Sequence, residues 1–157
     1  DMASVSKQKL VDEPLLRLLI REEGWKDKPY RCSRGKQTIG VGHNLDASGL
    51  CEEAIIAQLE HDVREAKKAA KRICGLWFDD LHPVRQEVLI CMVFQLGEGG
   101  VRQFTQTLMD MSMGNYMRAA DRIRKSKWAA QTPQRVERLA KILERASYDG
   151  IIDETIG

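Results

Sequence analysis

The sequence has no long uninterrupted run of apolar residues. The longest such run is VLICMVF, at residues 88–94, whereas a helix needs about 20 apolar residues to cross a bilayer. The opening stretch, DMASVSKQK, also lacks the apolar core of a signal peptide. We therefore expect neither a membrane span nor a secretory leader, and we expect the first few residues to contribute nothing to the fold.

Paired metal-binding or disulfide motifs are also missing. None of the four cysteines, Cys32, Cys51, Cys74 and Cys91, forms a CxxC pair or a Cys/His spacing typical of zinc. We expect four reduced thiols made in a cytoplasm, with the last three buried in apolar helical surroundings. A chain of 157 residues can bury a sizeable core without cross-links, as one domain or as two small lobes that share a core.

The charge is nearly balanced overall, at +2, but it is unevenly placed. Residues 118–145 contain nine basic residues against three acidic ones, a local net charge of +6. These are Arg118, Arg122, Arg124, Lys125, Lys127, Arg135, Arg138, Lys141 and Arg145 against Asp121, Glu137 and Glu144. Such a segment attracts polyanions such as nucleic acid, acidic lipid or bacterial cell wall, and a solvated helix face is the other interpretation.

Most of the chain has a helical pattern. Residues 12–23 are expected to form a helix with Asp12 as its N-cap, Pro14 in its first turn and Gly24 as its end. Residues 28–42 alternate as a hairpin that turns near Arg34 and Gly35. Further helices are expected over 51–73, 83–97 (apolar nearly all round, and so the centre of the core), 101–112, 115–125 and 133–146.

The hairpin raises a question, because it contains two glycines in the stretch RGKQTIGVGH at residues 34–43. Glycine weakens a strand, since it adds backbone entropy and contributes no side chain to packing. Gly40 and Gly42 therefore suggest that another group comes close to this backbone.

Glu23 lies at the expected C-terminal end of its helix. Unpaired carbonyl groups there disfavour a negative charge, so we expect the position to favour the protonated acid. A protonated carboxyl group can donate a proton to a leaving oxygen, which is the general-acid role in glycoside cleavage. Solvated acidic residues are also common at helix ends, so the position alone leaves both interpretations open.

The spacing after Glu23 favours the catalytic interpretation. Eight residues separate Glu23 from Cys32, and five more separate Cys32 from Thr38. This pattern resembles the Glu, Asp-or-Cys, Thr triad of the phage-type lysozymes, glycoside hydrolase family 24, which include the lysozyme of T-even bacteriophages. EEGWKDKPYRCSRGKQTIGVGHNL resembles the family's catalytic segment, and VRQEVLICMVFQLGEGGVRQFTQTL and KSKWAAQTPQRVERL resemble its core and C-terminal segments in the same order. The resemblance extends from Leu15 to about Tyr148.

The resemblance implies a role for each matching residue. Glu23 would be the general acid, and Cys32 and Thr38 would flank the water or the sugar carbon on the other side of the bond. Gly40 and Gly42 would let a sugar approach the backbone. Phe94 and Gln95 match residues that contact glycan. Asn44, Thr107 and Arg122 lie where the family has glycan-contacting residues of other types. His43 and Asp62 match a supporting pair, and Arg135 matches a supporting arginine.

The resemblance also implies the fold and the activity. It implies a mainly helical α+β, lysozyme-like domain over 1–157, with a hairpin lobe at about 24–50, a helical lobe at about 12–23 and 70–150, and a linking helix at about 51–73. The implied activity is that of an endolysin, which cleaves the β-1,4 bond between N-acetylmuramic acid and N-acetylglucosamine. The implied protein is a monomer that needs no metal or organic cofactor. It binds peptidoglycan glycan strands and no nucleic acid. It stays in the host cytoplasm until a separate holin-type pore releases it.

Two features depart from the family pattern. The connection NLDASG after the hairpin is shorter than in the T-even enzyme, so part of the glycan-contacting surface is expected to differ. Cysteine also replaces the usual aspartate, and an ordinary thiol is mostly neutral at pH 7. Cys32 could act as a nucleophile, as a base that orients water or as an electrostatic stabiliser, and the sequence leaves these three open.

Three other functions compete with hydrolysis. A dinucleotide site at GVGHNL is disfavoured because the third glycine and a parallel βαβ pattern are missing. A nucleic-acid-binding helical domain would use the basic segment, and its binding would weaken steeply with salt. A domain with the same fold could instead hold glycan without cleaving it.

Overall fold

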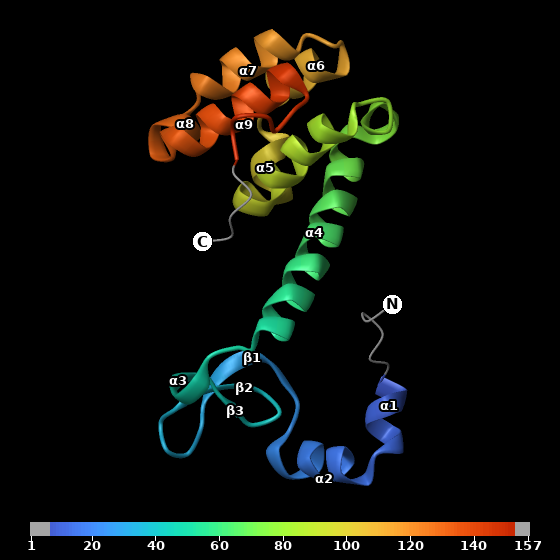
Figure 1. Cartoon of the computed structure of the whole chain (residues 1–157), viewed down its shortest axis with the longest axis vertical. Coiled ribbons are helices and arrows are strands. Elements are labelled where there is room, and N and C mark those ends of the chain that lie inside the picture. Colours follow the sequence, from blue (N-terminus) through green and yellow to red (C-terminus); the bar gives the residue numbers. More distant parts are fainter. Residues whose placement is uncertain (1–6, 153–157) are drawn as a thin grey trace. The chain divides into compact units, whose positions relative to one another are not determined.

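A computed structural model of the chain describes residues 7–152 (Figure 1). By its internal contacts the chain divides into two compact units, one ending at Leu59 and the other beginning at Glu60. Residues 1–6, which we expected to contribute nothing to the fold, lie outside the described residues. No helix within the described range is long and apolar enough to pass through a membrane.

The first unit begins with two short helices, α1 (Lys7–Asp12) and α2 (Pro14–Glu23). Asp12 ends α1, so its expected role as the N-cap of the next helix is wrong; Glu13 occupies that position, without a side-chain capping bond. Pro14 is the first residue of α2, where its missing N–H leaves no hydrogen bond unmade. Gly24 ends α2 as expected, with φ 83° and its N–H donating to the Ile20 carbonyl at 2.9 Å.

A three-stranded antiparallel sheet follows, in the order β1 (Lys26–Arg31), β2 (Gln37–Gly40), β3 (His43–Asn44). The expected turn is confirmed, because the Gly35 N–H donates to the Cys32 carbonyl at 2.8 Å. Thr38 pairs with Tyr30 on one side and with Asn44 on the other, so it lies on the central strand. The sequence did not predict β3, because two residues are too few to show an alternating pattern.

A short helix, α3 (Leu45–Ser48), closes the sheet. The Asn44 side chain caps it by accepting a hydrogen bond from the Ala47 N–H at 3.1 Å, and Asp46 Oδ2 accepts one from the Gln37 N–H at 3.0 Å. The long helix α4 (Glu52–Cys74) then runs from the first unit into the second, close to its expected bounds.

The second unit is organised around α5 (Pro83–Arg102), which follows a short 3₁₀ helix, η1 (Gly75–Phe78). Val88, Leu89 and Met92 of α5 are each 1% exposed, so the expected centre of the core is confirmed. Gly97 has non-helical angles (φ 75°, ψ 166°) and divides α5 into two helical stretches. The expected end at Gly97 is therefore a kink, after which helical structure resumes.

The remaining helices are α6 (Thr105–Ser112), α7 (Tyr116–Arg124), α8 (Lys127–Gln131) and α9 (Pro133–Arg145). The sequence predicted all of these except α8, which has only five residues. Its start depends on Ser126, whose hydroxyl oxygen accepts a hydrogen bond from the Ala129 N–H at 3.2 Å. A mainly helical fold with one small antiparallel sheet confirms the expected α+β class.

Arg85 fixes the C-terminal end of α9. The last carbonyl groups of a helix lack partners within the helix, and the Arg85 guanidinium donates to those of Leu143 and Glu144 at 2.7 and 2.9 Å. The same guanidinium lies over the Tyr116 ring, 3.7 Å from its centroid, a geometry that favours a cation–π interaction. Arg85 therefore links α5, α7 and α9.

Candidate active site

The carboxyl group of Glu23 lies against the backbone of Gly42. A Cβ atom placed on Gly42 would be only 2.7 Å from Glu23 Oε2 and 3.0 Å from Glu23 Cδ. Gly42 also has a positive φ of 66°, which glycine adopts readily. Only glycine fits this position without displacing the carboxyl group, so the group that approaches Gly42 within the chain is the Glu23 side chain.

Gly40 has a different reason to be glycine. Its φ is 69°, but a Cβ atom there would meet nothing within 4 Å. The positive φ alone therefore accounts for Gly40, and the approach of a sugar to this part of the backbone stays a prediction.

Cys32 and Thr38 come together across the turn between β1 and β2. The Lys36 carbonyl accepts hydrogen bonds from the Cys32 N–H at 2.9 Å and from the Thr38 hydroxyl at 3.0 Å. Thr38 is only 3% exposed, whereas Cys32 is partly exposed. The Lys36 carbonyl thus binds the Cys32 backbone and the Thr38 side chain at the turn of the sheet whose β2–β3 turn contacts Glu23.

The surroundings of Cys32 favour its thiolate form. Hydrogen bonds from the backbone amides of Lys36 and Arg34 hold the pKa of the Cys32 thiol below its ordinary value, and the Thr38 hydroxyl acts in the same direction. Partial burial opposes this effect but does not cancel it. Cys32 is therefore more ionised near neutral pH than the ordinary thiol that we expected from the sequence.

The other cysteines have different surroundings. Burial raises the pKa of the Cys74 thiol to about 12, and it also raises the pKa of Cys91, which is half-buried. Cys51 is exposed, so the expectation that it is buried is wrong. It lies just before the first residue of α4, where its side chain remains accessible to water.

His43 and Asn44 form β3 and take part in local hydrogen bonds. His43 Nε2 forms a short hydrogen bond to the Gly49 carbonyl, and Asn44 caps α3. The capping bond already uses Asn44 Oδ1, which leaves its amide NH₂ group for any glycan contact. Asp62 is half-buried on α4, and its pairing with His43 stays a prediction.

Phe94 and Gln95 lie on α5 in the second unit. Phe94 is 46% exposed and lines a pocket of about 310 Å³ together with Asp62, Glu65, Ala66 and Val93. Gln95 Oε1 accepts a hydrogen bond from Trp128 Nε1 at 2.9 Å, which fixes the orientation of its amide. The structure thus brings two of the expected residues, Asp62 and Phe94, to one pocket.

Thr107 and Arg122 line another pocket of about 310 Å³, together with Phe104 and Lys125. Arg122 Nε donates to Asp110 Oδ2 at 2.5 Å, and Asp110 is only 5% exposed. Arg122 therefore already compensates a buried carboxylate, and loss of such a partner leaves an uncompensated charge in the interior. Arg135 lies half-buried on α9.

Sequence reasoning missed two residues of these sites. Lys36 acts through its backbone, which no side-chain pattern reveals. Asp110 meets Arg122 only because α6 packs on α7. The single feature of the sequence that could have indicated a buried carboxylate is the place of this acidic residue between two methionines. Within residues 7–152, no group of three or more His, Cys, Asp or Glu side chains is placed to hold a metal ion.

The fold, a mainly helical chain with one small antiparallel sheet, is consistent with the lysozyme class of hydrolases. The chain belongs to the phage lysozyme family, whose model matches residues 20–146. It is 31% identical over 123 positions to the endolysin of Salmonella phage P22, covering 73% of this chain and 82% of that protein. It is 25% identical over 155 positions to probable T4-type lysozyme 2 of Dictyostelium discoideum, covering 81% and 91%. It is 26% identical over 154 positions to the pre-baseplate central spike protein Gp5 of Enterobacteria phage T4, covering 80% of this chain and 27% of that protein.

Gly42→Ala should displace the Glu23 carboxyl group and reduce lytic activity about a hundredfold, the typical effect of a 1 Å misplacement. Gly40→Ala is the matched control, because it introduces the same strain at a similar positive φ but meets no neighbouring atom. Gly40→Ala should lose less than about threefold of the lytic activity. Both variants should lose a similar amount of folding stability, about 1–2 kcal/mol. The measurements are clearing of outer-membrane-stripped Gram-negative cells and thermal unfolding. Equal activity losses in the two variants would contradict the contact.

The lowered pKa of Cys32 predicts that its thiol is alkylated at lower pH in the folded chain than in the unfolded chain. In a Cys51→Ser background, iodoacetamide should modify the native chain with a pH midpoint below that of the urea-unfolded chain. The midpoint is lower because a thiol whose pKa is lowered in the folded chain gives more thiolate at every pH between the folded and unfolded pKa values. Modification should also stop lysis in this background and spare the same protein carrying Cys32→Asp. A midpoint at or above the unfolded value, or full activity after modification, would refute the prediction.

Proposed function

We propose that the chain is an endolysin that hydrolyses the β-1,4 bond between N-acetylmuramic acid and N-acetylglucosamine in bacterial peptidoglycan, which leads to lysis of the host cell. The observation that carries the proposal is the Glu23 carboxyl group lying against Gly42, in a chain of the phage lysozyme family. The P22 relative, named an endolysin, supports the same role.

Glu23 acts as the general acid in this proposal. Its protonated carboxyl group donates to the glycosidic oxygen as the bond to the sugar carbon breaks, so the leaving sugar departs with a hydroxyl group. The Gly42 backbone limits the positions that the carboxyl group can occupy. Such positioning matters because proton transfer requires the acid to lie within hydrogen-bond reach of the oxygen.

Cys32 and Thr38 act on the opposite side of the bond. The reaction leaves positive charge on the sugar carbon, and a thiolate nearby stabilises that charge or accepts a proton from the attacking water. The lowered pKa of Cys32 favours the anion, which is the charge that aspartate provides in most of the family. The Thr38 hydroxyl donates its proton to the Lys36 carbonyl, and its oxygen is left to accept a hydrogen bond from the attacking water.

The second unit supplies glycan contacts in this proposal. Phe94 offers an exposed ring and Gln95 a fixed amide, while Thr107 and Arg122 contribute polar contacts. Asn44 of the first unit contributes a further polar contact through its amide NH₂ group. His43, Asp62 and Arg135 support the site. We propose that the whole chain acts as one catalytic domain and as a monomer, without a cofactor. It waits in the host cytoplasm until a holin-type pore gives it access to the peptidoglycan.

Glu23→Gln should fold normally and lose at least about a hundredfold of the lytic rate, because loss of a general acid typically costs 10²–10⁴-fold. Glu22→Gln is the matched control, since it changes the neighbouring exposed carboxylate of α2 and should stay active. Turbidity clearing and circular dichroism measure the two effects. An active Glu23→Gln beside an inactive Glu22→Gln would show that the acid is assigned to the wrong residue.

A further inference from the structure

The structure divides the basic residues of 118–145 into two groups. Four of them form ion pairs: Arg118 and Arg122 with Asp110, Arg124 with Glu137 and Glu144, and Lys125 with Asp121. The other five form no ion pair with any residue of 7–152; they are Lys127, Arg135, Arg138, Lys141 and Arg145. The local charge excess is therefore concentrated on α8 and α9.

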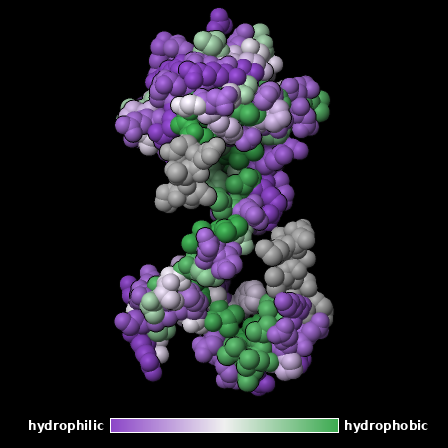
Figure 2. Space-filling model, in the orientation of Figure 1, coloured by the Kyte–Doolittle hydropathy of each residue, from purple (hydrophilic) through white to green (hydrophobic). Residues whose placement is uncertain are grey.

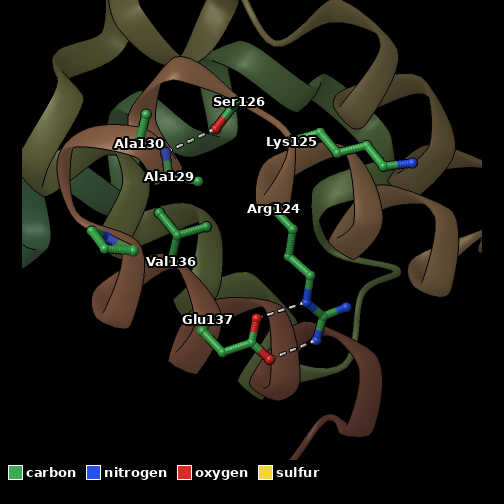
Figure 3. A pocket seen from close by; sticks show the side chains of 8 residues that line it. Arg124, Lys125, Ser126, Ala129, Ala130, Val136 and Glu137 are labelled. Atoms are coloured by element: carbon green, nitrogen blue, oxygen red, sulfur yellow. Dashed lines mark hydrogen bonds and ion pairs between the residues drawn. The ribbon is translucent and has the colours of Figure 1, made fainter.

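Arg124 of α7 engages both carboxylates of α9. It donates to Glu137 at 2.9 and 3.2 Å, and it forms a short hydrogen bond to Glu144 (Figure 3 shows the Glu137 pair). The two glutamates are seven residues apart, so they lie on the same side of the helix. Lys141 still feels Glu137 electrostatically, but the carboxylate makes its hydrogen bonds with Arg124.

Arg138, Lys141 and Arg145 form a basic stripe along α9. Their spacing of three and then four residues places them on one face of a helix, about 10 Å from first to last. The buried residues of α9 are on other faces: Val136, Leu139, Ala140, Ile142 and Leu143. Arg138 and Arg145 are exposed and Lys141 is half-buried. Figure 2 shows that the visible surface over α7, α8 and α9 is mostly hydrophilic.

We infer that the basic stripe of α9 is a docking surface, separate from the catalytic residues, for the free carboxylates of peptidoglycan stem peptides. This inference rests on the proposed function, which brings the chain to a wall whose stem peptides carry such groups at regular intervals. Arginine binds carboxylates through two parallel hydrogen bonds. The stripe has two arginines, and Arg124 makes the hydrogen bonds of both acidic residues of α9.

Nucleic acid fits the stripe less well. The chain as a whole has a net charge of only +2, whereas tight binding to duplex DNA depends on many phosphate contacts. Proteins that bind single strands also stack bases on aromatic side chains, and α9 contains none. A short stripe of three cations suits scattered carboxylates better than a continuous phosphate backbone.

The test compares two triple variants with the same charge change. The first is Arg138→Gln, Lys141→Gln, Arg145→Gln on α9, and the control is Arg64→Gln, Lys67→Gln, Lys71→Gln on α4, which has the same spacing. Unlike the stripe, the α4 cations follow an acidic stretch of their own helix, which contains Glu52, Glu53, Glu60, Asp62 and Glu65. Co-sedimentation with purified sacculi at low salt measures binding, and cleavage of a short soluble glycan without stem peptides measures catalysis.

The α9 triple variant should raise the Kd for sacculi about tenfold, as expected for three exposed charge contacts, and the control less than twofold. Both should cleave the soluble glycan at the wild-type rate, so a failure of catalysis is seen separately from a failure of docking. On sacculi whose carboxylates are amidated, wild type and the α9 variant should bind equally. Single substitutions at the two exposed arginines should each raise the Kd about twofold, which provides a test if the triple variant does not fold.

Three results would overturn the inference. Equal weakening by the α4 and α9 variants would indicate a general charge effect. A difference that persists on amidated sacculi would show that stem-peptide carboxylates are not the partner. Unchanged binding of the α9 variants to untreated sacculi, or tighter wild-type binding to a DNA oligonucleotide than to sacculi, would also exclude it.

Discussion

The contact between the Glu23 carboxyl group and the Gly42 backbone is the constraint on which the rest of the candidate site depends. It requires α2 to end at Glu23, which Gly24 ensures, and it requires a glycine with positive φ at the turn between β2 and β3. After β3, Asn44 caps α3, and Asp46 of α3 accepts a hydrogen bond from the Gln37 N–H at the start of β2. The end of α2 and the conformation of one glycine therefore determine where the Glu23 carboxyl group lies.

The second unit distributes its charges between structure and surface. Arg85, Arg122 and Arg124 each satisfy groups that would otherwise lack a partner, namely helix-end carbonyls, a buried carboxylate and two glutamates of α9. Cations used in this way are not available to a polyanion, because their hydrogen bonds are already made. The remaining cations concentrate on α8 and α9, which is why a local charge of +6 alone did not indicate where binding would occur.

The sequence predicted the fold better than the details of the site. Long periodic segments such as α4 and α5 were identifiable because their apolar pattern persists over many residues, whereas β3 and α8 are too short to have one. The spacing of Glu23, Cys32 and Thr38 identified the candidate residues. It could not show that Gly42 accommodates Glu23, or that the Lys36 and Arg34 amides favour the Cys32 thiolate, because backbone groups have no signature in a sequence.

The bond that the enzyme breaks is the most direct test of this account. Purified sacculi digested with the protein can be reduced with borohydride, and the new chain ends identified by mass spectrometry. Hydrolysis assisted by Glu23 predicts that reduced N-acetylmuramic acid accumulates at the new ends. Reduced N-acetylglucosamine, an anhydro sugar, or no new ends at all would contradict the central claim.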